Sequence, residues 1–200
     1  MIIRLLLATV ILVPLWAQAA PAPDPVDSVR DATDQLLAKL VEVKPLFKED
    51  PDKFFSEVET SLAPFIDFDG FARGVMAKYY RRATEAQQVA FAVKFQAELV
   101  RTYANALVEF DNQKVEIKPL ATPPSDGRAT VELEIYGKDG AVYPVVYTLA
   151  LVDGSWKLRN VVVEGINLGL QFRSQFANYM QKYGNDIDKV IENWDVDVSA

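Results

Sequence analysis

The sequence predicts an α+β fold in which helices pack against one antiparallel sheet. Changes in hydrophobic periodicity along the 200 residues support this prediction. Apolar residues recur at helical spacing up to about residue 110, alternate with a period of two from Lys114, and return to helical spacing after Gly165. This order of helices, consecutive strands and further helices is typical of α+β proteins.

The first two helices are bounded by prolines. An amphipathic helix runs from Val26 to Val43 and stops before Pro45, which cannot continue it. Asp50 precedes a proline at the first helical position, a combination that favours a helix start. The second helix therefore begins there and ends near Pro64.

The next two predicted helices differ in how strongly their residues favour a helix. The segment from Phe68 to about Tyr80 follows Asp67, which can cap it, but two internal glycines predict a weak helix or two turns. The segment from Thr84 to about Phe110 is the longest. It opens on the capping-box pattern Thr84-Glu85-Ala86-Gln87, and its apolar residues keep helical spacing throughout.

Strands follow, with turn sequences between them. Glycines at residues 137–140 and in Asp153-Gly154 mark tight turns, so consecutive strands are expected to form an antiparallel meander of four to five strands. After Gly165, helical patterns occur around Phe172 and again beyond Gly184. Alternating apolar residues predict strands at residues 115–117, 131–135, 143–151 and 156–164.

The composition excludes several classes of site. The chain contains no cysteine and no histidine, and its formal net charge is −7. It can form neither a disulfide nor a Cys or Cys/His zinc site, and it lacks the histidine of a Ser-His-Asp triad. The negative charge also makes nucleic acid an unfavourable partner. No metal and no cofactor are predicted.

Residues 1–19 have the pattern of a secretory signal peptide. Arg4 gives a positive start, residues 5–15 are almost wholly apolar, and Ala17-Gln18-Ala19 is a small-x-small cleavage site. A membrane anchor is the alternative, but about a dozen apolar residues are too few to span a hydrocarbon core about 30 Å thick. Residues 20–200 are expected to form one domain, with a helical subdomain from roughly residue 50 to residue 110.

Acidic side chains are the remaining candidates for acid–base chemistry. Asp67 with Asp69 and Asp186 with Asp188 lie at predicted helix starts, where capping and the helix dipole already favour carboxylates. Glu164, at the end of a strand, could be catalytic or could anchor backbone N–H groups where the strand leads into a helix. Without a cysteine or histidine partner, anchoring is the favoured interpretation.

Basic side chains gather in one segment of this acidic chain. They could form a solvated helix end, or a docking surface for an acidic protein or for anionic lipid head groups. The candidate partner-binding residues, which alternate with two tyrosines, are Arg73, Lys78, Arg81 and Arg82.

Two blocks of sequence carry a family resemblance. The first runs from Pro64-Phe65-Ile66-Asp67-Phe68 through Tyr79-Tyr80-Arg81-Arg82-Ala83-Thr84, and the second from Asp153-Gly154-Ser155-Trp156 through Val163-Glu164-Gly165-Ile166-Asn167-Leu168. In this order and at this spacing, the blocks resemble the MlaC family of periplasmic phospholipid-transport proteins. With the signal peptide and the length, the resemblance covers essentially all of the chain.

The resemblance implies an NTF2-like sheet wrapped by helices, and a monomeric periplasmic carrier that maintains outer-membrane lipid asymmetry. Phospholipid is its cargo, and its implied partners are an outer-membrane lipoprotein–porin complex and the MCE-domain subunit of an inner-membrane ABC transporter. No catalysis is needed. The alternatives are a periplasmic NTF2-like enzyme that uses Glu164 or a Tyr-Asp pair as acid or base on an apolar substrate, and a periplasmic chaperone.

The acyl chains of such a cargo need a long dry slot. We expect this slot between the helix that starts at Thr84 and one face of the sheet. The candidate lipid-binding residues are Phe71, Val75, Phe95, Leu99, Tyr103, Val131, Leu133, Val145, Tyr147, Leu149, Val161, Val163, Ile166 and Leu168.

Overall fold

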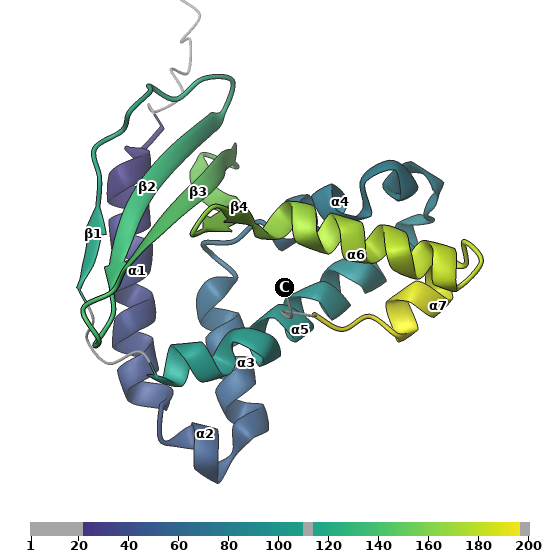
Figure 1. Cartoon of the computed structure of the whole chain (residues 1–200), viewed down its shortest axis with the longest axis horizontal. Helices are drawn as coiled ribbons and strands as arrows, with labels where there is room; N and C mark the ends of the chain where they lie inside the picture. The colour runs from purple at the N-terminus through teal and green to yellow at the C-terminus, as the bar shows by residue number, and fades with distance from the viewer. Residues whose placement is uncertain (1–21, 110–113, 197–200) are drawn as a thin grey trace, which may run out of the picture.

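An antiparallel sheet carries a helix along one face and a group of helices beyond one edge (Figure 1). The computed structural model describes residues 22–109 and 114–196, so the predicted signal peptide lies outside the described residues. The strands follow the chain order β1 (Val115–Ile117), β2 (Arg128–Tyr136), β3 (Val142–Val152), β4 (Ser155–Val163) and β5 (Ile166–Asn167).

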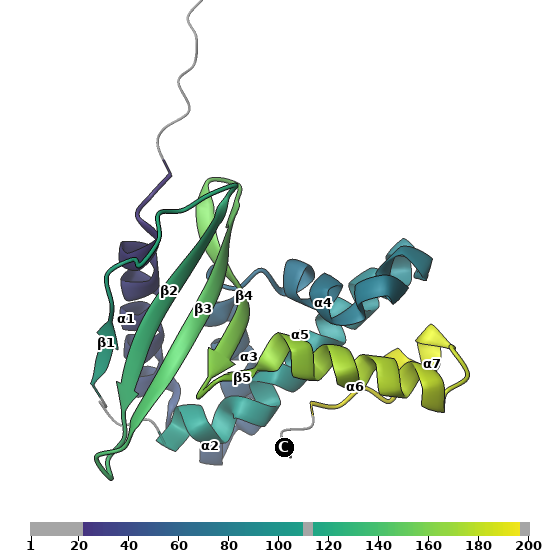
Figure 2. The ribbon, with the colours of Figure 1, turned by 45° about the horizontal axis from the view of Figure 1, so that its top comes forward.

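The helices divide into two groups around this sheet. Figure 2 shows α1 running behind the strands, while α4 and α6 extend away beyond β4. No helix in the described ranges is long and apolar enough to cross a membrane. The helices are α1 (Pro25–Val43), α2 (Leu46–Glu49), α3 (Pro51–Leu62), α4 (Phe68–Met76), the 3-10 helix η1 (Ala77–Arg82), α5 (Glu85–Glu109), α6 (Leu168–Lys182) and α7 (Ile187–Glu192).

The predicted α+β class and the antiparallel meander are confirmed. The expected weak helix after Asp67 consists of α4 followed by η1. Two short elements were not predicted, namely α2 and β5. With four and two residues respectively, they are too short to show a hydrophobic period.

Side-chain caps fix the helix starts as the sequence predicted. Asp67 Oδ1 accepts the Gly70 N–H at 2.9 Å, and Asp186 Oδ1 accepts the Lys189 N–H at 3.1 Å. The capping box before α5 is also present, because Thr84 Oγ1 accepts the N–H of residue 87 at 3.2 Å. The capping interpretation of Asp67 and Asp186 is therefore confirmed.

The turn after α3 is held against β4 by backbone and side-chain contacts. The Asp67 N–H donates to the Leu158 carbonyl at 2.9 Å, and the Leu158 N–H donates to the Phe65 carbonyl at 2.8 Å. The Arg159 guanidinium also pairs with the Asp67 carboxylate. These contacts place the start of α4 beside the middle of β4.

A β-bulge interrupts β4 at the same point. Thr148 pairs with Asn160 and Leu149 pairs with Leu158, so Arg159 is an extra residue without a partner on β3. A bulge changes the direction of the side chains that follow it and is often found next to functional sites.

The buried apolar residues form three clusters. One lies between α1 and the sheet and includes Val131 and Leu133, and another joins the end of α1 to α3 and α5 around Phe54. The third, which we call the aromatic cluster, fills the space between α4, α5, α6 and α7. Its buried rings are those of Phe71, Tyr79, Phe91, Phe95, Phe172, Phe176 and Trp194.

Candidate functional site

An apolar cavity of about 260 Å³, which we call the main cavity, lies between α5 and β4. The end of α3, the start of α4 and the first turns of α6 complete its walls. Such a hollow suits hydrocarbon, and Tyr103 is the one lining residue with a polar side-chain group. Its walls are formed by Leu62, Ile66, Phe68, Phe71, Leu99, Val100, Tyr103, Leu107, Leu158, Val161, Val163, Leu168 and Phe172.

The β-bulge explains how β4 supplies three lining residues to the main cavity. In a regular strand, side chains three residues apart point to opposite faces. The extra residue Arg159 shifts this alternation, so Leu158 lies on the cavity side together with Val161 and Val163.

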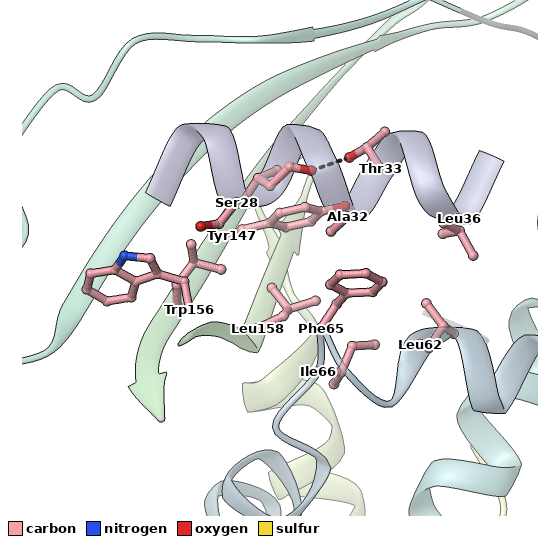
Figure 3. A pocket seen from close by; sticks show the side chains of 12 residues that line it. Ser28, Ala32, Thr33, Leu36, Leu62, Phe65, Ile66, Tyr147, Trp156 and Leu158 are labelled. Carbon is pink, nitrogen blue, oxygen red and sulfur yellow. Dashed lines mark hydrogen bonds between the residues drawn. The ribbon is translucent and has the colours of Figure 1, made fainter. Parts of the chain in front are cut away.

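A second apolar hollow of about 90 Å³ lies between α1 and the sheet. Figure 3 shows α1 above this hollow and Leu62, Phe65 and Ile66 facing it from the opposite side, with the Tyr147 ring under the helix. Leu62, Ile66 and Leu158 line both this hollow and the main cavity. The two spaces are therefore separated only by a shared apolar wall.

The tyrosines at these hollows are partly buried. Burial raises the pKa of the Tyr103 hydroxyl at the main cavity, because removal from water disfavours the phenolate. Burial likewise raises the pKa of Tyr147 at the second hollow. Both residues therefore present neutral rings to the space.

Several of the predicted lining residues meet at these hollows. Tyr147 and Leu149 lie on the second hollow, and Val75 lies on a third, more polar pocket beside α6. The predicted residues on the main cavity are Phe71, Leu99, Tyr103, Val161, Val163 and Leu168.

Five of the predicted residues line none of these three hollows, and their assignment to the slot stays a prediction. Val131, Leu133 and Val145 are at most 3% exposed and fill the core between the sheet and α1. Phe95 is enclosed in the aromatic cluster. Ile166 follows the tight β4–β5 turn and is 49% exposed, because its side chain points outward there.

Other lining residues were not predicted. Leu158 was missed because strict alternation along β4 does not reveal a bulge. Leu62 and Phe172 lie in segments that the sequence predicts to be helical, and the helical spacing of the apolar residues there was a usable signal. The unpredicted residues of the main cavity are Leu62, Ile66, Phe68, Val100, Leu107, Leu158 and Phe172.

Glu164 does not anchor the start of α6, contrary to the sequence prediction. It lies exposed in the β4–β5 turn with a φ of 51°. Two asparagines cap the helix instead. Asn160 Oδ1 accepts the Gly169 N–H at 2.9 Å, and Asn167 Oδ1 accepts the Leu170 N–H at 3.0 Å. An amide oxygen accepts these bonds without bringing an extra charge to the helix start.

The four basic residues form an exposed patch on α4 and η1, which we call the basic patch. Arg73 lies over the Tyr80 ring with its Cζ 4.9 Å from the centroid. Lys78 and Arg82 both lie over the ring of Tyr79, the first at 5.0 Å and the second at 5.7 Å. Arg81 is exposed beside them. Contacts with aromatic rings reduce the freedom of these charged side chains.

Comparison with known proteins finds matches that extend over most of the chain. The family model described as MlaC protein matches residues 30–196. The toluene tolerance protein ttg2D of Pseudomonas putida is 43% identical over 183 residues, which are 90% of this chain and 83% of that protein. The intermembrane phospholipid transport system binding protein MlaC of Haemophilus influenzae is 22% identical over 79% of this chain and 75% of its own.

A solved structure has a similar fold. It is a phospholipid-binding protein from Ralstonia solanacearum in complex with a phospholipid, and it superposes with a TM-score of 0.77 at 26% identity. The match covers 85% of this chain and 94% of the other.

Proposed function

The chain belongs to the MlaC family, and from this premise we propose that it is a periplasmic carrier that holds the acyl chains of a phospholipid in the main cavity. The observation that carries this proposal is the lining of that cavity, in which every side chain except Tyr103 is purely apolar. The relatives whose names describe phospholipid binding or transport support the same cargo.

Energetics explain why a carrier needs such a cavity. Two acyl chains of about sixteen carbons, at about 0.8 kcal/mol per buried CH₂, cost on the order of 25 kcal/mol to expose to water. A protein that moves a lipid between two membranes must offset this cost by surrounding the chains with apolar side chains. The second hollow adds apolar space behind Leu62, Ile66 and Leu158.

Transport by this carrier requires no chemical change of the cargo. We therefore propose that the protein is not an enzyme. It would pass phospholipid between an outer-membrane lipoprotein–porin complex and the MCE-domain subunit of an inner-membrane ABC transporter, and so maintain outer-membrane lipid asymmetry.

The cargo is tested by native mass spectrometry of the protein purified from cells. The wild-type chain should carry a mass increment equal to a diacyl phospholipid. Val163→Trp should remove the increment, because the larger ring occupies the main cavity. Val162→Trp is the matched control. Val162 directly precedes Val163 on β4 and does not line the cavity.

Two outcomes would contradict the proposal. One is a wild-type protein that is consistently empty, and the other is a Val163→Trp variant that retains lipid as fully as Val162→Trp does. Circular dichroism of both variants establishes that each is folded before the masses are compared.

The basic patch is the proposed docking surface for the membrane partners. Concentrated positive charge on a chain of net charge −7 can orient an approaching acidic surface. Reversal of Arg81 and Arg82 to glutamate should weaken binding to the isolated MCE-domain subunit and leave lipid occupancy unchanged. The control is the reversal of Lys44 and Lys48 to glutamate. Both lysines are exposed, and they precede α3 in the sequence, outside the basic patch. Equal affinities of the two double variants would refute the docking assignment.

A further inference from the structure

A pocket of about 240 Å³ with polar walls, which we call the polar pocket, lies at the start of α6. It differs from the apolar hollows because two arginines and two asparagines contribute to its walls. The remaining walls come from α4 and from the first turn of α6. The lining residues are Phe71, Gly74, Val75, Arg159, Asn160, Asn167, Gly169, Leu170 and Arg173.

The hydrogen-bond acceptors of this pocket are already in use. Asn160 Oδ1 and Asn167 Oδ1 accept the N–H groups of the first turn of α6, as described above. The Gly74 carbonyl accepts from Arg173 Nε at 3.0 Å. Gly169 is essential to this arrangement, because a Cβ there would collide with the Asn160 side chain.

The donors of the pocket, in contrast, are largely uncommitted. Arg159 uses Nε for Asp67, and Arg173 uses Nε for the Gly74 carbonyl. Within residues 22–109 and 114–196, no side chain or carbonyl accepts from the terminal guanidinium nitrogens of either arginine, or from the Asn160 and Asn167 amide nitrogens. A pocket that offers donors and positive charge is suited to an anion.

The charge of the pocket is positive overall. Asp67 compensates Arg159, whose side chain is still 41% exposed and therefore accessible. Arg173 has no carboxylate partner in the described part of the chain. One full positive charge thus remains at the pocket, next to a guanidinium that is held in place by its ion pair.

The polar pocket directly adjoins the main cavity. Phe71 lines both spaces. Leu168 lines the main cavity, while its chain neighbours Asn167 and Gly169 line the polar pocket. On β4, the bulge residue Arg159 lies between the cavity residues Leu158 and Val161. The two spaces are therefore neighbours that share the Phe71 ring as a wall, and an amphipathic molecule with its apolar part in one space and an anionic part in the other would pass this ring.

We propose that the polar pocket binds the phosphate of a phospholipid whose acyl chains occupy the main cavity. This inference rests on the proposed function and adds to it a defined site for the charged part of the cargo. Arg159 and Arg173 would donate to the phosphate oxygens from two sides, as guanidinium groups commonly do. The two asparagine amides would supply further donors.

The test compares two lipids with the same tails. Lipid-free protein is incubated with vesicles that contain dipalmitoyl-phosphatidylglycerol or dipalmitoylglycerol, and the bound lipid is counted by native mass spectrometry. The variants are Arg173→Gln, Arg173→Lys and the control Arg30→Gln, which removes an exposed arginine of α1 outside all three hollows. Binding of inorganic phosphate alone is measured by calorimetry.

The expected result is selective for the phosphate. Arg173→Gln should reduce the affinity for phosphatidylglycerol about tenfold, the usual order for one charged hydrogen-bond partner. It should leave dipalmitoylglycerol binding unchanged. Arg173→Lys should retain part of the affinity because it keeps the charge, and Arg30→Gln should behave as the wild type.

Three results would overturn the proposal in different ways. Phosphatidylglycerol binding that is equal in Arg173→Gln and the wild type would refute the phosphate site and leave the proposed function intact. Tight binding of inorganic phosphate that Arg173→Gln abolishes without changing lipid affinity would assign the pocket to free phosphate. Failure of the wild type to bind either lipid would refute the proposed function itself.

Discussion

Helix α5 passes through two regions that are packed in different ways. Near its start, Phe91 and Phe95 are fully buried, and their ring centroids lie 5.1 Å and 6.3 Å from that of Trp194. One and two turns after Phe95, Leu99 and Tyr103 face the main cavity. The same helical period therefore continues from a filled core into a hollow one.

The difference depends on what lies opposite each part of the helix. The start of α5 faces α4, α6 and α7, whose aromatic rings interlock. The later part faces β4, from which only valine and leucine side chains project. Hydrophobic periodicity thus indicates which face of a helix points inward, but the partner residues decide whether the space is filled.

The largest expected effect comes from emptying the filled region. Phe95→Ala should lower the free energy of unfolding by about 3–5 kcal/mol, because it leaves a new cavity in the aromatic cluster. Leu99→Ala, one turn away, should lower it by only about 1–2 kcal/mol, since that side chain already borders a hollow. Chemical denaturation measures both.

The exposed residue Val93 provides the control on the same helix. It is 61% exposed, so Val93→Ala should change stability by less than about 0.5 kcal/mol. Equal losses for the variants at positions 95 and 99 would contradict the distinction between a filled and a hollow region.

A smaller effect is expected where the C-terminal segment covers the aromatic cluster. The Tyr179 hydroxyl hydrogen-bonds to the Asp195 carboxylate, beside Trp194. Tyr179→Phe should lower the free energy of unfolding by about 1 kcal/mol, the typical contribution of one hydrogen bond. The Leu99 side of α5 should be unaffected, so lipid occupancy should not change.

The pH dependence gives an independent readout for Tyr179. Burial and the Asp195 carboxylate raise its pKa from 10 to about 12. The folded state therefore holds this proton more tightly, and the resulting stabilisation is complete below pH 10 and is lost as the pH rises through about 12. Tyr179→Phe should remove this part of the decline, and an identical alkaline slope in both proteins would contradict the assignment.

The smallest effect is expected on the sheet, outside both regions. Lys114 and Lys118 hydrogen-bond to Glu116 and lower the pKa of its carboxyl from 4.5 to about 2. The stabilisation from Glu116 is therefore present above pH 4.5 and is lost as the pH falls through about 2. Glu116→Gln should make acid unfolding slightly less steep between these values, and it should leave lipid binding unchanged.

The sequence was sufficient for elements whose cause is local. The capping box at Thr84 and the acidic caps at Asp67 and Asp186 depend on residues within one helical turn, and all three are present. The meander likewise follows from alternation and short turns. The fold class could be predicted because these local signals agree with one another.

The lining of the hollows was predicted only in part, and the differences between prediction and structure have two physical causes. The bulge at Arg159 changes which β4 residues face the helices, and an alternation pattern cannot reveal an inserted residue. Val131 and Leu133 show the same alternation as cavity residues, but α1 and the neighbouring strands fill the space around them.

The sequence by itself determined the α+β order, the starts of α4, α5 and α7, the absence of cysteine and histidine chemistry, and the resemblance to the MlaC family. Only the tertiary structure decided which apolar residues enclose empty space and that Arg159 and Arg173 meet at one pocket. These properties depend on contacts between residues far apart in the chain, such as α4 with β4 and α6. Local patterns carry no information on how completely such surfaces fit together.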